Sequence, residues 1–302
     1  MSDSPLSPCV VELEGDFTHE FIHTRGIRLH VALAGEIGAP LILLVHGWCG
    51  GWFEFKDVLA PLAARGFRVA ALDLRGFGMS DKPPAGMGQD IRTLTGDISG
   101  VIQALGYDRA IVGGYDTGAA LAWSTAMDKP ERVAGIISIA GIYPVDMRRA
   151  IAAAPWDFLW IIGTAIWCRF PVRKVPDRFY TFELDNNTSR SFKSDFTHRY
   201  EEFRDLRHRA ARIGHVYRGA IYNHRLLTAP LPLKWIDTKT RAPVLLLHAD
   251  QALWGPVIKR ARKRTTGTFT ELNVPGTKNM PHIENPAGFI TAVGTWLESV
   301  YK

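Results

Sequence analysis

The sequence predicts an α/β protein: a mostly parallel sheet covered by helices on both faces, with a helical cap inserted after the sixth core strand. Continuous apolar runs of strand length, such as residues 41–45, are typical of strands buried on both faces, and they alternate with helical patterns. Such alternation indicates a parallel sheet. It stops between residues 143 and 239, which are rich in aromatic residues and arginine and contain no aliphatic run of strand length, and this change predicts the cap.

The chain has 302 residues, close to the upper limit for one hydrophobic core. Its composition, 46% hydrophobic and 22% charged, is that of a globular protein. We therefore expect a core of residues 1–142 and 240–302, with residues 143–239 as the cap. The apolar stretches fall short of the roughly 18 to 20 residues that a membrane span needs, so no membrane partner is expected.

The elements follow in order along the chain. Residues 17–24 and 27–33 alternate between apolar and polar side chains, and the Arg25-Gly26 pair between them predicts an antiparallel hairpin. Next we expect strands at 41–45, 67–72, 109–113 and 133–140, with helices at 54–65 and 91–105. After the cap we expect strands at 244–248 and 268–274 and a closing helix at 286–300, which has Pro286 in its first turn.

A Gly-x-Asp-x-Gly segment follows the strand expected at 109–113 and precedes a small-residue helical pattern, so it predicts strand, sharp turn and helix. Gly114 and Gly118 let the backbone pass close to its neighbours while Asp116 is held at the carboxyl end of the strand. A carboxylate in such a turn is a nucleophile that forms an alkyl ester by attacking an electrophilic carbon. The alternative is an Asp that caps the helix beginning at Thr117.

A second chemical feature is the glycine-rich loop His46-Gly47-Trp48-Cys49-Gly50-Gly51-Trp52, which follows a buried strand. Such a loop brings backbone N–H groups to a developing oxyanion, although a plain strand-to-helix turn would have a similar sequence. Trp48, Asp73 and Asp116 all follow strands, and in a parallel sheet the ligand site lies at the carboxyl edge. We expect the three residues to meet there.

The net charge of +6 is concentrated in two segments. Residues 169–225 hold thirteen Lys or Arg against seven Asp or Glu, and residues 259–264 form a second basic cluster. No helix-turn-helix, zinc-finger or RNA-binding pattern accompanies them, so solvated helix faces explain both and no nucleic-acid partner is expected.

The three cysteines, Cys9, Cys49 and Cys168, are odd in number and widely spaced, which predicts reduced thiols and neither a metal site nor a cofactor site built on them. The first residues lack the basic start and apolar stretch of a signal peptide, which predicts a cytoplasmic protein. Oligomeric state leaves no trace in the sequence.

Four motifs together resemble the alpha/beta-hydrolase superfamily: His46-Gly47-Trp48, Asp73-x-Arg75-Gly76-x-Gly78-x-Ser80, Gly114-Tyr115-Asp116-Thr117-Gly118 and Pro281-His282-Ile283-Glu284-Asn285-Pro286. Within it they resemble the Asp-nucleophile branch of epoxide hydrolases and haloalkane or haloacetate dehalogenases, over nearly the whole chain. The resemblance implies that Asp116 is the nucleophile and that the backbone N–H groups of Trp48 and Thr117 form the oxyanion hole.

The leaving group distinguishes the members of this branch. Haloalkane dehalogenases resemble one another in an Asn and a Trp where this chain has Trp48 and Thr117, and haloacetate dehalogenases have arginines where it has Thr117 and Ala120. Epoxide opening needs an acid, which the family supplies from a cap Tyr-Arg pair, and Tyr217-Arg218 fits that pattern. Packing of Tyr217 on the core is the alternative. By its place in the cap, Trp167 is expected to line the substrate pocket.

The resemblance fails at the water-activating groups. The family's base histidine corresponds to Asn279, and the nearest histidine, His282, is the remaining candidate for the base if its loop is shifted toward Asp116. The two positions for the acid that orients the base hold Ala140 and Ala252, so Asp250 is the remaining candidate, with a loop-exposed role as its alternative.

Two classes of function follow from these motifs. The first is an epoxide hydrolase-like enzyme, or a dehalogenase, that acts on a small electrophile and has an altered water-activating step. The second is a relative that keeps the pocket but binds a ligand or performs a non-hydrolytic step. In the first class, loss of the base predicts a long-lived ester at Asp116.

Overall fold

The computed structural model describes residues 4–84, 90–170 and 175–301. Eight strands form one sheet in the order β1-β2-β4-β3-β5-β6-β7-β8, in which β2 pairs antiparallel with β1 and β4 and all other pairs are parallel. The strands are β1 Thr18–Thr24, β2 Ile27–Ala34, β3 Leu41–Val45, β4 Arg68–Leu72, β5 Ala110–Tyr115, β6 Val133–Ile139, β7 Val244–Leu247 and β8 Phe269–Leu272. The predicted fold class is confirmed.

The local sequence explains both kinds of strand. Every residue of β3, β5, β6 and β7 is buried, which is why these strands consist almost entirely of apolar residues and glycine. The predicted hairpin joins β1 to β2 through Arg25 and Gly26, both with positive φ (51° and 75°), as a two-residue turn between twisted strands requires.

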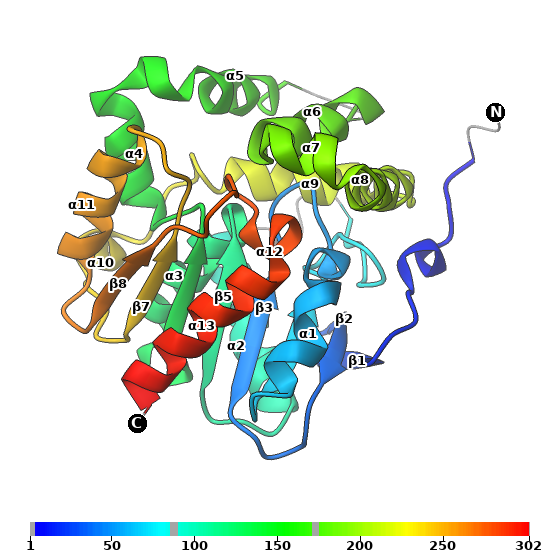
Figure 1. The fold of residues 1–302 in the computed structure, drawn as a ribbon, viewed down its shortest axis with the longest axis horizontal. Coiled ribbons are helices and arrows are strands. Elements are labelled where there is room, and N and C mark those ends of the chain that lie inside the picture. The colour runs from blue at the N-terminus through cyan, green and yellow to red at the C-terminus, as the bar shows by residue number, and fades with distance from the viewer. Residues whose placement is uncertain (1–3, 85–89, 171–174, 302) are drawn as a thin grey trace.

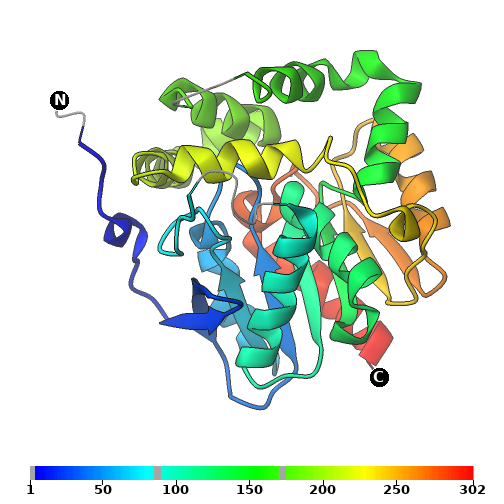
Figure 2. The ribbon, with the colours of Figure 1, turned by 180° about the vertical axis from the view of Figure 1, so that it is seen from behind.

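Helices cover both faces of the sheet. Lys56–Ala63 (α1) and Pro286–Tyr301 (α13) pack together on the face toward the viewer in Figure 1. Ile91–Ala104 (α2) and Thr117–Asp128 (α3) pack together on the opposite face, which Figure 2 brings to the front. The remaining core helices are η1 Pro8–Val11, η2 Trp52–Phe55, η3 Pro130–Arg132, α11 Trp254–Arg264 and α12 Pro281–Glu284. Of these, η1, η3 and α12 were not anticipated from the sequence.

The segment between β6 and β7 contains only helices in its described residues. They are α4 Pro144–Ala153, η4 Pro155–Phe158, α5 Leu159–Trp167, α6 Asp177–Asn187, α7 Arg190–Asp195, α8 Thr197–Ala211, α9 Val216–Arg225 and α10 Leu233–Ile236. Helices α5 to α9 lie across one edge of the sheet, at the top of Figure 1. Asp116 at the end of β5 shares a cavity with residues of α5, α6 and α9, so this edge is the one where the parallel strands end.

We use the name cap for the helices α4 to α10, and η1 connects them to the core. Helix η1 packs on α8, and the Arg209 guanidinium donates to the Val10 carbonyl at 3.1 Å. The Trp52 indole N–H donates to the Val11 carbonyl at 2.9 Å, so the same segment is also fixed to the core. Within the described residues, no helix is both long enough and apolar enough to span a bilayer.

Candidate active site

Asp116 lies in a strained turn between β5 and α3. Its backbone has φ 52° and ψ −114°, a conformation that is costly for a residue other than glycine and is typical of functional turns. A Cβ at Gly114 would lie 2.3 Å from the Gly118 carbonyl carbon, and one at Gly118 would lie 2.1 Å from the Val45 carbonyl oxygen, so both positions require glycine. The Asp116 side chain makes no capping hydrogen bond, so it does not cap α3 in the manner of the alternative hypothesis.

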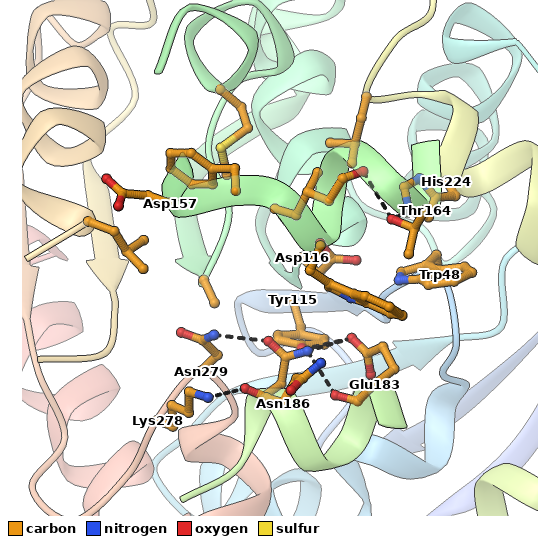
Figure 3. Close-up of a pocket in the computed structure, with 18 of the residues that line it drawn as sticks. Trp48, Tyr115, Asp116, Asp157, Thr164, Glu183, Asn186, His224, Lys278 and Asn279 are labelled. Carbon is orange, nitrogen blue, oxygen red and sulfur yellow. Dashed lines mark hydrogen bonds between the residues drawn. The ribbon is translucent and has the colours of Figure 1, made fainter. Parts of the chain in front are cut away.

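The turn directs Asp116 into a cavity of about 430 Å³ between the core and the cap (Figure 3). Such a volume suits a small organic molecule. One part of the wall is apolar and includes Met147, Phe158, Trp160, Ile161, Phe182 and Leu227. The other part is polar and is formed by Glu183, Asn186, Asn187, Lys278 and Asn279. A substrate with an apolar body and one polar reacting end therefore fits this cavity.

Burial and a second carboxylate control the protonation of Asp116. Burial raises the pKa of its carboxyl to about 7, and the negative charge of Glu183 acts in the same direction. The backbone N–H groups of Thr117 and Trp48 lie close enough to the carboxyl to favour its charged form, and they partly oppose that rise in pKa. These are the two amides expected to form the oxyanion hole. Both lie beside the carboxyl oxygen that would become negative if an ester of Asp116 were attacked by water.

Asp73 fixes the loop that carries Trp48 through hydrogen bonds. The Asp73 carboxylate accepts from the backbone N–H groups of Trp52 and Met79, each at 3.0 Å, and pairs with His30 at 2.8 Å. His46 is buried, and its Nε2 accepts from the Leu74 N–H at 3.1 Å. His46 and Asp73 therefore fix the loop and do not line the cavity, so Trp48 and Asp116 meet there without Asp73.

Asn279 does lie at the cavity, at the position that the resemblance assigns to the base. Its backbone N–H donates to the Asn187 carbonyl at 2.9 Å, and its Nδ2 donates to Asn187 Oδ1 at 2.9 Å. An amide has no basic lone pair for proton transfer, so this side chain connects the core to the cap and does not activate water.

The structure does not bring His282 to Asp116. The imidazole is fully buried, stacks on Phe55 with ring centroids 4.9 Å apart and lies 5.4 Å from the Tyr115 ring. Burial, with a smaller contribution from Arg207, lowers its pKa to about 3. His282 is not among the residues that line the cavity, so the expectation that it serves as the base is corrected: it packs as a neutral ring in the core.

Tyr217 is also outside the cavity. Its hydroxyl accepts a hydrogen bond from Arg218 Nε at 3.1 Å, and the residue of α9 that lines the cavity is His224. The expectation that Tyr217 faces the leaving oxygen is therefore not met. His224 hydrogen-bonds to Thr164 Oγ1 through Nε2 at 2.7 Å, and burial lowers its pKa to about 4, so it is a neutral ring there.

Two other expectations change in the same way. Trp167 stacks on Phe179, with ring centroids 5.1 Å apart, and it is Trp160 that lines the cavity. Asp250 is exposed and does not line the cavity, so it is a solvent-exposed loop residue, as the alternative for it stated. Of the two alanines at the family's acid positions, Ala140 lines the cavity and Ala252 does not.

The residue that the sequence did not single out is Glu183, on α6. It is buried, it lines the cavity, and its Oε2 accepts from Arg207 Nη1 at 2.5 Å. Its Oε1 accepts from Asn187 Nδ2 at 2.8 Å and from the Tyr115 hydroxyl at 3.4 Å. The only available signal was the i,i+4 pair of Glu183 and Asn187 on one helix face, which many solvated helices share.

Arg207, on α8, joins Glu183 to a second buried carboxylate. The guanidinium donates to Glu54 of η2 from both Nε, at 3.0 Å, and Nη2, at 2.5 Å. Glu54 does not line the cavity, and burial raises its pKa to about 6 in spite of Arg207. The described residues contain no cluster of three or more His, Cys, Asp or Glu that could hold a metal ion.

Comparison with known proteins identifies the family. The sequence pattern of the alpha/beta hydrolase fold matches residues 40–251. The chain is 40% identical over 140 residues to AB hydrolase superfamily protein YfhM of Bacillus subtilis, covering 46% of this chain and 49% of that protein. It is 36% identical over 124 residues to Epoxide hydrolase B of Mycobacterium tuberculosis, covering 40% and 35%. The chain thus spans half or less of the length of these two curated relatives.

A solved structure extends the similarity to nearly the whole chain. The crystal structure of a putative alpha/beta hydrolase from Nostoc sp PCC 7120 superposes with a TM-score of 0.79, covering 93% of this chain and 98% of that one. The sequence identity is 23%, so this likeness shows the fold.

Proposed function

The chain belongs to the alpha/beta hydrolase fold family, and from this premise we propose that it is an epoxide hydrolase-like enzyme with Asp116 as its nucleophile. The carboxylate attacks a ring carbon of the epoxide, the C–O bond breaks, and an alkyl ester forms on Asp116. The relatives named as epoxide hydrolases support the substrate class. The observation that carries the proposal is the Asp116 carboxyl in a strained turn, directed into the cavity and toward the N–H groups of Trp48 and Thr117.

Hydrolysis of the ester uses the same two amides. Water attacks the carbonyl carbon of the ester, and the oxygen that becomes negative is the one that the Trp48 and Thr117 N–H groups face. The mostly apolar wall around Trp160 and Phe182 would hold the organic part of the substrate away from water.

One observation favours an alkyl halide as a second substrate class. The indole Nε1 of Trp254 is buried without a hydrogen-bond partner among the described residues, and Trp254 lines the cavity. A halide leaving group would accept a hydrogen bond from such a donor. Epoxides and halides must therefore be compared on one carbon skeleton.

The test uses styrene oxide and (2-bromoethyl)benzene. Rapid mixing, acid quench and intact-mass analysis should show a single covalent adduct, which peptide mapping should assign to Asp116. Asp116→Asn should form none. In a single turnover in ¹⁸O-labelled water, the label should enter the Asp116 carboxyl and not the diol. A folded protein without an adduct from either reagent, or a label that appears in the diol at the first turnover, would overturn the proposal.

A further inference from the structure

The proposed reaction needs an acid for the epoxide oxygen and a base for water, and the family's usual groups do not supply them here. Asn279 is an amide, and Tyr217 and His282 lie outside the cavity. Of the other ionisable residues that line it, Asp157 is exposed and His224 is hydrogen-bonded to Thr164. The Tyr115 phenol also lines it, and burial raises its pKa well above the ordinary value. The Lys278 ammonium is bound to the Asn186 carbonyl, on the polar wall. Glu183 is the buried carboxyl that shares the cavity with Asp116 (Figure 3).

We infer that Glu183 acts first as the acid and then as the base of this reaction, in place of the family's tyrosine and histidine. The inference rests on the proposed function, because it requires an ester at Asp116. It assigns the proton transfers to a residue of the cap and leaves nucleophilic attack to the core.

The charges around the cavity favour one shared proton. Two buried carboxylates, Glu183 and Glu54, pair with a single guanidinium, that of Arg207, and the negative charges of both also act on the Asp116 carboxyl. Full ionisation would leave an uncompensated negative charge in a low-dielectric site, so the group retains a proton near neutral pH. The raised pKa values of Asp116, about 7, and Glu54, about 6, agree with this.

The other titratable groups facing this cluster stay in one form near neutral pH. Burial raises the pKa of the Tyr115 phenol and of the Cys49 thiol well above their ordinary values. The pKa of His282 is lowered to about 3 and that of His224 to about 4, so both rings are neutral. Lys278, at the cavity, has a pKa lowered from its ordinary value mainly by partial burial.

The proton balance closes over one catalytic cycle. The proton that this group of carboxyls retains can sit on Asp116 or on Glu183, and the cycle begins from the arrangement in which Asp116 is ionised and Glu183 carries the proton. As the Asp116 oxygen bonds to the ring carbon, the epoxide C–O bond breaks and its oxygen takes the proton from Glu183. The Glu183 carboxylate then removes a proton from water, whose oxygen attacks the ester carbonyl carbon. The tetrahedral oxyanion collapses and the diol oxygen leaves with the proton that Glu183 took. Asp116 leaves this step protonated, and transfer of that proton to Glu183 restores the starting state.

The hydrogen bonds around Glu183 hold it in place for both steps. Arg207 holds Oε2, while Asn187 and the Tyr115 hydroxyl hold Oε1. Asn187 is in turn held by Asn279 from the core. By this route the residue at the family's base position retains a part in the reaction, as a positioning residue for the carboxylate that replaces the base.

The two reagents of one carbon skeleton test the inference. Opening of styrene oxide needs an acid, whereas bromide leaves (2-bromoethyl)benzene without one, and both esters need a base to hydrolyse. Glu183→Gln should alkylate Asp116 with the bromide at least as fast as wild type, because a repelling charge is gone. It should form the styrene oxide adduct more slowly and hydrolyse either ester about 10²-fold more slowly, which is the usual contribution of one general base.

Asp185→Asn is the matched control. Asp185 lies on the same helix, two residues away, where it pairs with Lys193 and accepts from the Tyr200 hydroxyl, and it does not line the cavity. Its substitution should leave all three rates unchanged. A second variant, Glu183→Ala, should regain ester hydrolysis when formate is added, which a structural role for Glu183 would not produce.

The outcomes separate the two proposals. If no adduct forms in wild type or in any variant, the nucleophile is wrong. If the Asp116 ester forms and decays equally fast in wild type, Glu183→Gln and Asp185→Asn, the nucleophile is right and the role of Glu183 is overturned. Slow decay in Glu183→Gln together with formate rescue of Glu183→Ala supports both proposals.

Discussion

Asn279 donates two hydrogen bonds to Asn187 of α6, from its backbone N–H to the carbonyl oxygen and from Nδ2 to Oδ1, each 2.9 Å long. Asn279, the core residue at the family's base position, therefore uses both its backbone and its side chain to bind the cap. This geometry connects the loss of the histidine to the position of Glu183, since Asn187 donates to Glu183 Oε1 at 2.8 Å.

The first prediction concerns restoration of the family's base. In a Glu183→Gln background, Asn279→His should speed hydrolysis of the Asp116 ester by less than about tenfold, because an imidazole without a carboxylate partner is poorly oriented and its charged form is not stabilised. Adding Ala140→Asp should bring the total to about 10²-fold. Ala140 is the better acid position because it lines the cavity and its φ of 47° is one that Asp tolerates better than most residues.

Ester decay followed by intact mass measures this prediction. Ala140→Asn is the matched control, because it has the shape of Asp without the charge and should add nothing to Asn279→His. Equal rates for Ala140→Asp and Ala140→Asn in that background would contradict the pairing of the two positions.

The second prediction is the pH dependence of alkylation. Only the ionised Asp116 carboxylate attacks, and its pKa is raised to about 7, so alkylation by (2-bromoethyl)benzene should rise about tenfold per pH unit below the midpoint. It should level off above about pH 8. In Glu183→Gln the midpoint should move lower, because the repelling charge is removed. A rate already at its plateau near pH 5 would show that Asp116 ionises in its ordinary range.

The third prediction concerns the buried ion pairs of Arg207. Arg207→Met should lower the free energy of unfolding by about 3–5 kcal/mol near neutral pH, because Glu54 and Glu183 lose their buried partner. Arg204→Met, on the same helix, removes a half-exposed pair with Glu201 and should cost at most about 1 kcal/mol. Urea unfolding measures both.

The loss of unfolding free energy caused by Arg207→Met should depend on pH, because the carboxyls that lose their partner can take up protons. Burial raises the folded-state pKa of Glu54 to about 6, so protonation below that pH favours the folded state and removes an unpaired charge. The loss caused by Arg207→Met should therefore be smaller near pH 5 than near pH 8. An equal loss at both values would mean that packing of the side chain, and not its charge, accounts for the effect.

The fourth prediction distinguishes a packing role for His282 from a catalytic one. Both ring nitrogens of His282 lack a hydrogen-bond partner among the described residues, so His282→Phe should keep ester hydrolysis and should not destabilise the fold near neutral pH. Because the folded-state pKa is about 3 and the unfolded chain binds a proton near pH 6.5, wild type should lose about 2 kcal/mol from this residue between pH 7 and 5.

Urea unfolding at the two pH values measures that difference. The Phe variant should show a loss smaller by that amount, since it has nothing to protonate in the unfolded state. A large fall in ester hydrolysis in a folded His282→Phe would instead restore His282 as the base.

The sequence was sufficient for the core because its signals are local. Apolar runs such as Leu41–Val45 and the glycines around Asp116 are fixed by burial and by close backbone contacts, whatever the cap does. The cap residues were harder to assign. Tyr217, Trp167 and Trp160 all lie on amphipathic or apolar helices, and which of them reaches the cavity depends on how each helix is rotated. A family pattern assigned Tyr217 and Trp167, whereas the packing of the cap helices put His224 and Trp160 in their places.

Glu183 could not have been found from the sequence for a related reason. Its place in the site depends on hydrogen bonds with Arg207, twenty-four residues further along the chain, and with Tyr115 of the core. It also depends on Asn279 of the core, which binds its neighbour Asn187. Taken alone, a glutamate on a charged helix is most often solvated. Only the fold shows that it is buried beside the carboxyl of Asp116.

The bridge from Glu54 through Arg207 to Glu183 also limits how the protein can be recombined. A chimera whose cap lacks an arginine at the position of Arg207 would leave Glu54 buried without its guanidinium. Such a product would carry an uncompensated buried charge unless η2, which contains Glu54, were exchanged along with the cap. The unit of exchange is therefore the cap together with η2, a segment about 90 residues earlier in the chain, and not the contiguous insertion that the sequence suggests.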